Sequence, residues 1–231
     1  MIPIRDDQPR FTTPYVSYFL IVLNLLIYFF ESALDPSSRY ALLYEFGVVP
    51  FRITQMLHGA VVFNSAAIGL PLLTSMFLHG SWIHVIGNMW FLWIFGDNIE
   101  DYLGHFKFLM FYLVSGVTAA VAQVVLISQS QIPTVGASGA IAGVLGAYFI
   151  LYPKARVLTW FPPVFLFYLP AWIMLGYWFV LQFLSGTATS VTYSAQKGGV
   201  AFWAHVGGFL AGILLIKIMP KHAQQPHYST W

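Results

Sequence analysis

Hydrophobic residues are grouped into six long runs, separated by intervals that contain charged residues, proline or glycine. About 20 consecutive apolar residues are needed to cross the hydrocarbon core of a bilayer as a helix. The pattern predicts helices over residues 15–34, 82–99, 106–128, 138–152, 165–184 and 201–219. The sequence therefore predicts an all-α polytopic membrane protein with a bundle of six transmembrane helices.

The interval over residues 35–81 is too long for a simple turn, and it contains many apolar residues together with Arg39, Glu45 and Arg52. Connections of this length usually carry structure or function of their own, so we expect a folded loop that is partly embedded in the membrane. No internal repeat or linker divides the chain. We expect one domain over residues 1–231, with short cytoplasmic tails at about 1–14 and 220–231 and a first helix that is retained.

The composition agrees with a membrane location and excludes several kinds of chemistry. Of the 231 residues, 58% are hydrophobic and 8% are charged, which is outside the range of soluble globular domains. The net charge is +2 and the basic residues are scattered, so nothing points to nucleic acid. The chain has no cysteine, which excludes disulfides and thiolate sites. We expect no metal site and no cofactor, and the bilayer itself is the expected environment.

The distribution of Lys and Arg predicts that both termini face the cytoplasm. With that orientation, seven of the ten basic residues lie on the inner side and three, Arg39, Arg52 and Lys197, on the outer side. The helices predicted over 82–99, 138–152 and 201–219 then all begin at the extracytoplasmic face. Polar residues near the start of these three helices should lie at one level.

Ser138 and His205 fall at equal distances from the ends of their predicted helices. The segments from Ser138 to Tyr152 and from His205 to Met219 each contain 15 residues. This length is about 22 Å, shorter than a hydrocarbon core of about 30 Å, so both side chains should lie below the outer surface. His84 and Asn88 are four residues apart and share one helix face. An ionisable group inside a membrane is costly and suggests function.

Small residues surround both Ser138 and His205. Gly136 permits a sharp turn before the serine, and a Gly-x-x-x-Gly pair follows it at Gly139 and Gly143. A second pair lies after the histidine, at Gly208 and Gly212. Ser138 alone could be one more small packing residue, but close approach of the two helices would bring a histidine to its hydroxyl. Neutral histidine can then act as general base for a serine nucleophile.

These motifs, with His79 ahead of His84 and Asn88, resemble the signature of the rhomboid intramembrane serine proteases. The resemblance covers the whole predicted six-helix body and implies a rhomboid-like bundle of the prokaryotic type. It implies a Ser–His dyad of Ser138 and His205, and an oxyanion stabilised by His84, Asn88 and the backbone N–H of Ser138. It also implies cleavage of single-pass transmembrane proteins in a prokaryotic plasma membrane, at a site open to the extracytoplasmic side.

One position departs from the family pattern. Some rhomboids carry an aromatic residue one helical turn after the serine, where it stacks on the histidine, and this chain has Ala142 there. The sequence does not indicate what orients His205 instead. It also leaves open the oligomeric state and the conformation of residues 185–200.

Three other functions compete with a serine protease. A zinc protease would need an HExxH motif, which the sequence lacks. A catalytically inactive rhomboid relative that binds membrane proteins would commonly lack the serine or the histidine, and both are present. A transporter would be expected to show inverted repeats or interrupted helix pairs, and neither is visible.

Overall fold

The computed structural model describes residues 1–59, 64–163, 165–191 and 201–222. The predicted loop over 185–200, the residue Lys197 and the predicted C-terminal tail therefore lie partly or wholly outside the described residues. In chain order the elements are β1 (Ile2–Arg5), α1 (Tyr15–Ala33), α2 (Pro36–Phe46), α3 (Pro50–Leu57), α4 (Ser65–Thr74), the 3-10 helix η1 (Ser75–Phe77), α5 (Trp82–Leu103), α6 (His105–Leu126), α7 (Ser138–Leu151), β2 (Arg156–Phe161), β3 (Phe165–Pro170), α8 (Ala171–Val191) and α9 (Phe202–Ile218).

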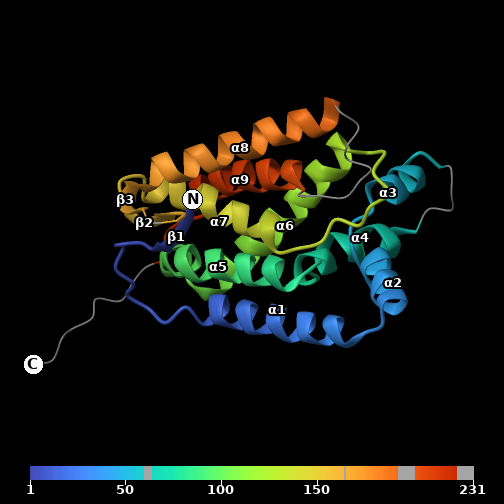
Figure 1. Cartoon of the computed structure of the whole chain (residues 1–231), viewed down its shortest axis with the longest axis horizontal. Coiled ribbons are helices and arrows are strands. Elements are labelled where there is room, and N and C mark those ends of the chain that lie inside the picture. Colours follow the sequence, from blue (N-terminus) through green and yellow to red (C-terminus); the bar gives the residue numbers. More distant parts are fainter. Residues whose placement is uncertain (60–63, 164, 192–200, 223–231) are drawn as a thin grey trace, which may run out of the picture.

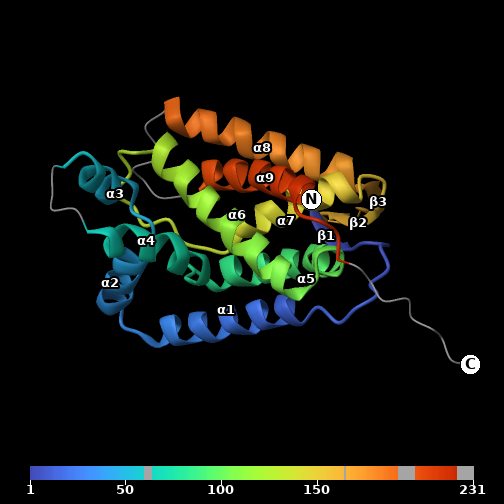
Figure 2. The same ribbon diagram turned by 180° about the vertical axis from the view of Figure 1, so that it is seen from behind.

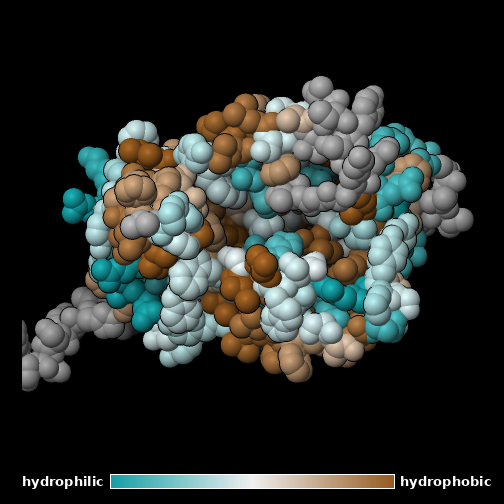
Figure 3. All heavy atoms as spheres, in the orientation of Figure 1, coloured by the Kyte–Doolittle hydropathy of each residue, from teal (hydrophilic) through white to brown (hydrophobic). Residues whose placement is uncertain are grey.

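The predicted fold class, a helical membrane bundle, is confirmed. The six predicted runs correspond to α1, α5, α6, α7, α8 and α9, whose axes run roughly along the long dimension of the molecule (Figures 1 and 2). In the described residues, α1, α6 and residues 171–188 of α8 are long and apolar enough to cross a membrane by themselves. The segment α4–η1 and α5 form a pair bent by 80°, and α7 and α9 are shorter apolar helices. Hydrophobic side chains gather over the central part of the surface and hydrophilic ones toward its two ends (Figure 3).

The helix predicted to begin at residue 165 begins six residues later, at Ala171, and this boundary of the prediction is wrong. Residues 165–170 form β3, which pairs antiparallel with β2 from Phe165↔Phe161 to Pro170↔Arg156. Prolines at 162, 163 and 170 cannot supply helical N–H donors, and the aromatic residues between them favour a strand. The strand β1 pairs with the other edge of β2, so the segment expected as a tail forms part of a three-stranded sheet.

The interval between the first two predicted helices is folded, as α2, α3, α4 and η1. It lies at the end of the molecule opposite the sheet (Figure 1). Its backbone holds the loop that leads into α7: Val48 and Thr134 exchange two hydrogen bonds of 3.0 and 2.7 Å, and the Gly136 N–H donates to the Ser75 carbonyl at 2.8 Å. This part of the chain therefore positions the residues just before Ser138.

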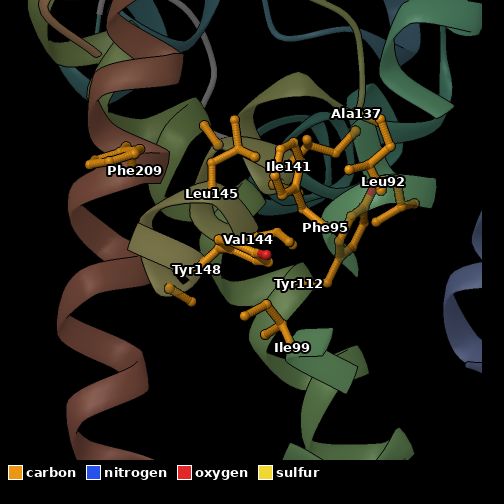
Figure 4. Close-up of a cluster of buried hydrophobic side chains, with 14 of the residues drawn as sticks. Leu92, Phe95, Ile99, Tyr112, Ala137, Ile141, Val144, Leu145, Tyr148 and Phe209 are labelled. Atoms are coloured by element: carbon orange, nitrogen blue, oxygen red, sulfur yellow. The ribbon is translucent and has the colours of Figure 1, made fainter. Parts of the chain in front are cut away.

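Helix α7 is the centre of the bundle and packs against α5, α6, α8 and α9. Every residue from Gly139 to Tyr148 is buried. Its larger side chains join those of α5 and α6 in one hydrophobic cluster, which includes Phe95 and Tyr112 (Figure 4). Small residues occupy the remaining faces of α7, and they set how closely its neighbours approach.

Glycines bring the backbones of α7 and α9 into direct contact. A Cβ atom added at Gly208 would collide with the carbonyl oxygen of Gly139, and one at Gly212 with the carbonyl oxygen of Gly143. Contact with α6 is equally close, since a Cβ at Gly139 would lie 2.6 Å from the Cβ of Ala119 on α6. The two Gly-x-x-x-Gly pairs therefore face one another, and α7 is held between α6 and α9.

Acidic side chains at the end of α5 hold the start of α1. Glu100 is fully buried and accepts hydrogen bonds from the backbone N–H groups of Val16 and Ser17 at 2.9 and 2.8 Å. Asp101 accepts from the backbone N–H of Phe11 at 2.6 Å and from that of Thr12 at 2.7 Å. These carboxylates satisfy donors that a helix start leaves unpaired. They bridge helices at the end of the bundle far from Ser138.

A second contact holds the N-terminal segment to α7. The hydroxyl of Tyr148 donates to the carboxylate of Asp6, and the backbone N–H of Arg156 donates to Asp7 at 2.8 Å. Burial raises the pKa of the Asp6 carboxyl above its ordinary value, and the nearby charge of Asp7 acts in the same direction, while the Tyr148 hydrogen bond opposes both. The folded protein thus binds a proton at Asp6 more tightly than the unfolded chain does.

Substitution of Gly208 tests the contact between α7 and α9. Gly208→Ala should lower the free energy of unfolding by about 1–3 kcal/mol, because the new methyl group must displace a helix backbone. Gly69→Ala is the matched control, since a Cβ at exposed Gly69 on α4 would meet nothing within 4 Å. Thermal unfolding in detergent measures both. A Gly208→Ala protein with the wild-type melting temperature would show that the two backbones do not touch.

The raised pKa of Asp6 predicts how stability depends on pH. Because the folded state holds the proton more tightly, the free energy of unfolding should fall as pH rises from the ordinary pKa of 3.8 through the raised value. Asp6→Asn keeps an acceptor for Tyr148 and removes the titration. Melting curves from pH 4 to 7 should therefore decline less steeply in the variant, and an equal slope in both proteins would contradict the assignment.

Candidate active site

Ser138 is the first residue of α7 and is half-buried. Gly136 has a φ of 126°, a conformation that favours glycine, so the chain can turn into the helix directly before the serine. The preceding loop is fixed by the hydrogen bonds to Val48 and Ser75. The hydroxyl is thus carried at the positive end of a buried helix, on a rigid support.

His205 lies in the first turn of α9, and 8% of its surface is exposed. The residues that flank the two candidate catalytic groups are in contact, because a Cβ at Gly139 would lie 3.8 Å from the carbonyl oxygen of Ala204 and 3.9 Å from its Cβ. The backbone N–H of Ala204 donates to Oε1 of Gln123 on α6 at 3.2 Å, which fixes the start of α9. The structure therefore places Ser138 and His205 at the same end of two touching helices.

His84 and Asn88 on α5 face the backbone just before Ser138. A Cβ atom at Gly136 would lie 2.7 Å from Nε2 of His84 and 3.4 Å from Nδ2 of Asn88. Both predicted oxyanion residues are thus beside the serine, and a side chain at position 136 would displace them.

His79 belongs to the same cluster and orients Asn88. The side-chain amide of Asn88 approaches Nε2 of His79 to 2.9 Å, and the backbone N–H of Ala137 approaches the same atom to 3.5 Å. Both partners are donors, so Nε2 of His79 is the acceptor and its ring proton lies on Nδ1. The ring of His79 also meets that of His84 edge to face, with centroids 5.1 Å apart.

Helices α1 and α2 hold His79 through its backbone. The carboxylate of Glu31 accepts from the N–H of His79 at 3.3 Å, and the guanidinium of Arg39 donates to the carbonyls of His79 and Gly80 at 3.2 and 2.9 Å. Glu31 and His79 are both fully buried. The folded first loop therefore supports the site by fixing the histidine that orients Asn88.

The arrangement brings together a serine hydroxyl, an imidazole and hydrogen-bond donors, which are the kinds of group that acyl transfer through a serine requires. The first N–H groups of α7 have no acceptor within the helix, and Gly136, two residues before the helix, lies beside the amide of Asn88 and the ring of His84. In the described part of the chain, no three His, Asp or Glu side chains are placed to hold a metal ion. The geometry matches acyl transfer through a serine more closely than metal-assisted hydrolysis.

Two residues that sequence reasoning did not single out also contact His205. Nδ1 of His205 lies 2.7 Å from Oε1 of Gln182, and the rings of Trp178 and His205 have centroids 5.6 Å apart with an interplanar angle of 34°. Both residues come from α8. The available signal was the presence of a polar amide in an otherwise apolar helix, which does not reveal its partner.

Comparisons with known proteins show to which family the chain belongs. The Rhomboid domain family matches residues 69–222. Over 150 residues the chain is 30% identical to "Rhomboid protein 1, mitochondrial" of Saccharomyces cerevisiae, covering 63% of this chain and 40% of that protein. Over 155 residues it is 33% identical to "Presenilin-associated rhomboid-like protein, mitochondrial" of Mus musculus, covering 63% and 37%.

A third relative is "Rhomboid-like protein 11, chloroplastic" of Arabidopsis thaliana, 28% identical over 148 residues, covering 64% of this chain and 51% of that protein. The chain thus spans about two fifths to one half of the length of these curated relatives. The family match covers about two thirds of the chain, from the middle of α4 to just beyond α9, and includes Ser138, His205 and the residues His79, His84 and Asn88 beside them. The protein is an integral membrane protein of the rhomboid family.

Proposed function

We propose that this protein is a serine endopeptidase that cleaves transmembrane segments of single-pass membrane proteins within the bilayer. The observation that supports this most strongly is the contact between the starts of α7 and α9, which places Ser138 and His205 on adjoining helix ends. Membership of the rhomboid family supports the same activity. The proposed site lies at the level where a substrate helix would unwind, below the membrane surface.

In the proposed reaction, the hydroxyl of Ser138 attacks the scissile carbonyl while Nε2 of His205 takes its proton. The new C–O bond gives a tetrahedral intermediate, whose collapse breaks the peptide C–N bond as His205 returns the proton to the leaving amine. Water then attacks the acyl-enzyme by the same route in reverse, releasing the acid product and free Ser138. No group changes its oxidation state in this reaction. No side chain other than Ser138 and His205 needs to transfer a proton.

In this proposal, three kinds of hydrogen-bond donor stabilise the oxyanion of the tetrahedral intermediate. These are the first N–H groups of α7, the ring of His84 and the second amide proton of Asn88, since the first is engaged with His79. Donors that are oriented before the reaction lose no energy in reorganising as charge develops. The hydrogen bond to His79 keeps Asn88 in place for this purpose.

The orientation of the protein in its membrane is also part of the proposal. The resemblance of the motifs implies a prokaryotic plasma membrane, whereas the names of the three relatives give mitochondria and chloroplasts. We propose that the N-terminal strand and the end of α9 lie on one side of the membrane and that the site opens toward the other. This orientation follows from the Lys and Arg distribution and from the placement of β1 and the end of α9 at one end of the bundle, opposite the end that carries α2, α3 and α4 (Figures 1 and 2).

Substitution of either dyad residue tests the proposed activity. Ser138→Ala and His205→Ala should each abolish cleavage of a transmembrane substrate by the purified protein, because the reaction loses its nucleophile or its base. A fluorophosphonate probe should label the wild type and fail to label Ser138→Ala. Ser115→Ala is the matched control: Ser115 is a buried serine on α6 that faces Gly143, one turn beyond Ser138, and its loss should leave labelling intact.

Full cleavage by a folded Ser138→Ala or His205→Ala protein would overturn the dyad. Absence of cleavage and labelling in the folded wild type, across a panel of single-pass substrates, would instead favour the inactive rhomboid relative that binds membrane proteins. Cleavage that stops in EDTA and returns with zinc would contradict the serine mechanism.

Asn88→Ala separates an oxyanion role from a purely structural one. If the amide stabilises the oxyanion, kcat should fall by a factor on the order of tens to a thousand, while Ser138 still reacts with a fluorophosphonate. Loss of the bond to His79 alone would cost about 0.6 kcal/mol of stability and leave kcat nearly unchanged. Asn24→Ala is the control, because Asn24 is a buried asparagine on α1 that bonds Leu20 at 2.7 Å away from the site. A destabilised Asn88→Ala enzyme with wild-type kcat would remove Asn88 from the oxyanion site.

A further inference from the structure

His205 cannot be oriented by the residue one helical turn after Ser138. That residue is Ala142, which is fully buried and has no ring to stack on the imidazole. A histidine can act as base toward the serine only if the nitrogen that faces the serine is unprotonated and correctly aimed. Some other group must therefore fix both the rotation and the tautomer of the ring.

The hydrogen bond between His205 and Gln182 fixes the tautomer. Oε1 of Gln182, an amide oxygen that can only accept, lies 2.7 Å from Nδ1 of His205. Nδ1 therefore carries the ring proton and donates it, which leaves Nε2 with a free lone pair. This is the tautomer that a serine hydroxyl requires, and the third residue of a Ser–His–Asp triad performs the same task.

Trp178 restricts the rotation of the same ring. Its indole lies against the imidazole at a centroid distance of 5.6 Å, and against Phe209 at 6.2 Å. Trp178 and Gln182 are four residues apart and so occupy one face of α8. One face of α8 thus supplies both a ring contact and a hydrogen-bond acceptor for His205.

Helix α8 is held at both ends, by the chain between α7 and β2 at its start and by α9 near its other end. At its start, the backbone N–H groups of Ala171 and Trp172 donate to the carbonyls of Ala155 and Pro153 at 2.8 and 3.1 Å. Near its other end, a Cβ at Gly186 would come within 3.1 Å of the Trp203 ring, so the glycine allows close packing there. Gln182 lies between these anchors, level with His205.

We propose that Gln182 is a positioning residue that holds His205 in its Nδ1-protonated tautomer, so that α8 completes the catalytic site. The inference rests on the proposed Ser–His dyad. Gln182 acts through His205 and need not touch the substrate. Its loss should therefore affect the reactivity of Ser138 toward any acylating or phosphonylating reagent, whatever the size of that reagent.

The test compares Gln182→Met and Gln182→Glu with the wild type in the full-length purified protein. Gln182→Met removes the acceptor at nearly constant volume. It should lower kcat and the rate of fluorophosphonate reaction about 10- to 100-fold, as for other partners that orient a working imidazole, with KM changed by less than about twofold. Gln182→Glu restores an acceptor and adds a charge. It should retain fluorophosphonate reaction, and the acidic limb of its kcat/KM profile should move upward by about one pH unit.

Gln123→Met is the matched control. It too removes a glutamine side chain that bonds the start of α9, but Gln123 holds the backbone of Ala204 and not the ring of His205. It should lower the melting temperature and leave the pH profile unmoved. If Gln182→Met behaves in the same way, with wild-type fluorophosphonate reaction, the inference is overturned. The inference is equally overturned if Gln182→Met raises KM alone, which would mark a substrate contact.

The dyad variants and the Gln182 variants distinguish failure of the proposed dyad from failure of the role proposed for Gln182. If the wild type fails to react at Ser138, or if His205→Ala reacts as fast as the wild type, the proposed dyad fails and the inference falls with it. If the dyad variants lose reaction and both Gln182 variants behave as wild type across the pH range, the dyad stands and only the inference fails.

Discussion

Direct backbone contact between α7 and α9 is the constraint on which the site depends. Inside a bilayer, lipid chains are as apolar as leucine, so helices associate through close packing and hydrogen bonds. Gly208 and Gly212 face the carbonyls of Gly139 and Gly143, and any side chain there would separate the helices. Because a proton transfer needs its donor and acceptor within hydrogen-bond reach, the proposed transfer from Ser138 to His205 depends on this close approach of the two helices.

Buried polar groups around the site are ordered by one another. Glu31 and Arg39 hold the backbone of His79, the ring of His79 accepts from Asn88, and Asn88 faces the backbone of Gly136. An unpaired polar group in a low-dielectric interior is costly, so a connected network specifies one arrangement. The folded segment between α1 and α5 thus contributes to the chemistry although it supplies no reacting group.

The sequence allowed much of the bundle and the identity of the clustered residues to be predicted, because both depend on local pattern. Hydropathy marked the six apolar runs, and helix length put Ser138 and His205 at one level. Hydropathy did not separate β3 from α8, since residues 165–170 are as apolar as the helix that follows. Nor could it pair Gln182 with His205. That contact depends on where α8 crosses α9, which no property of either segment alone determines.

The choice of a neutral amide beside His205 has a physical reason and a consequence. A carboxylate would stabilise the imidazolium formed during the reaction, but a charged side chain inside the bilayer costs about 2.5–3.5 kcal/mol on insertion scales. Glutamine fixes the same tautomer without that cost and gives less help to the charged intermediate. More of the stabilisation must then come from the oxyanion donors around Ser138. Since Gln182 and Trp178 both belong to α8, the proposed base His205 keeps these two contacts only while α8 stays packed against α9.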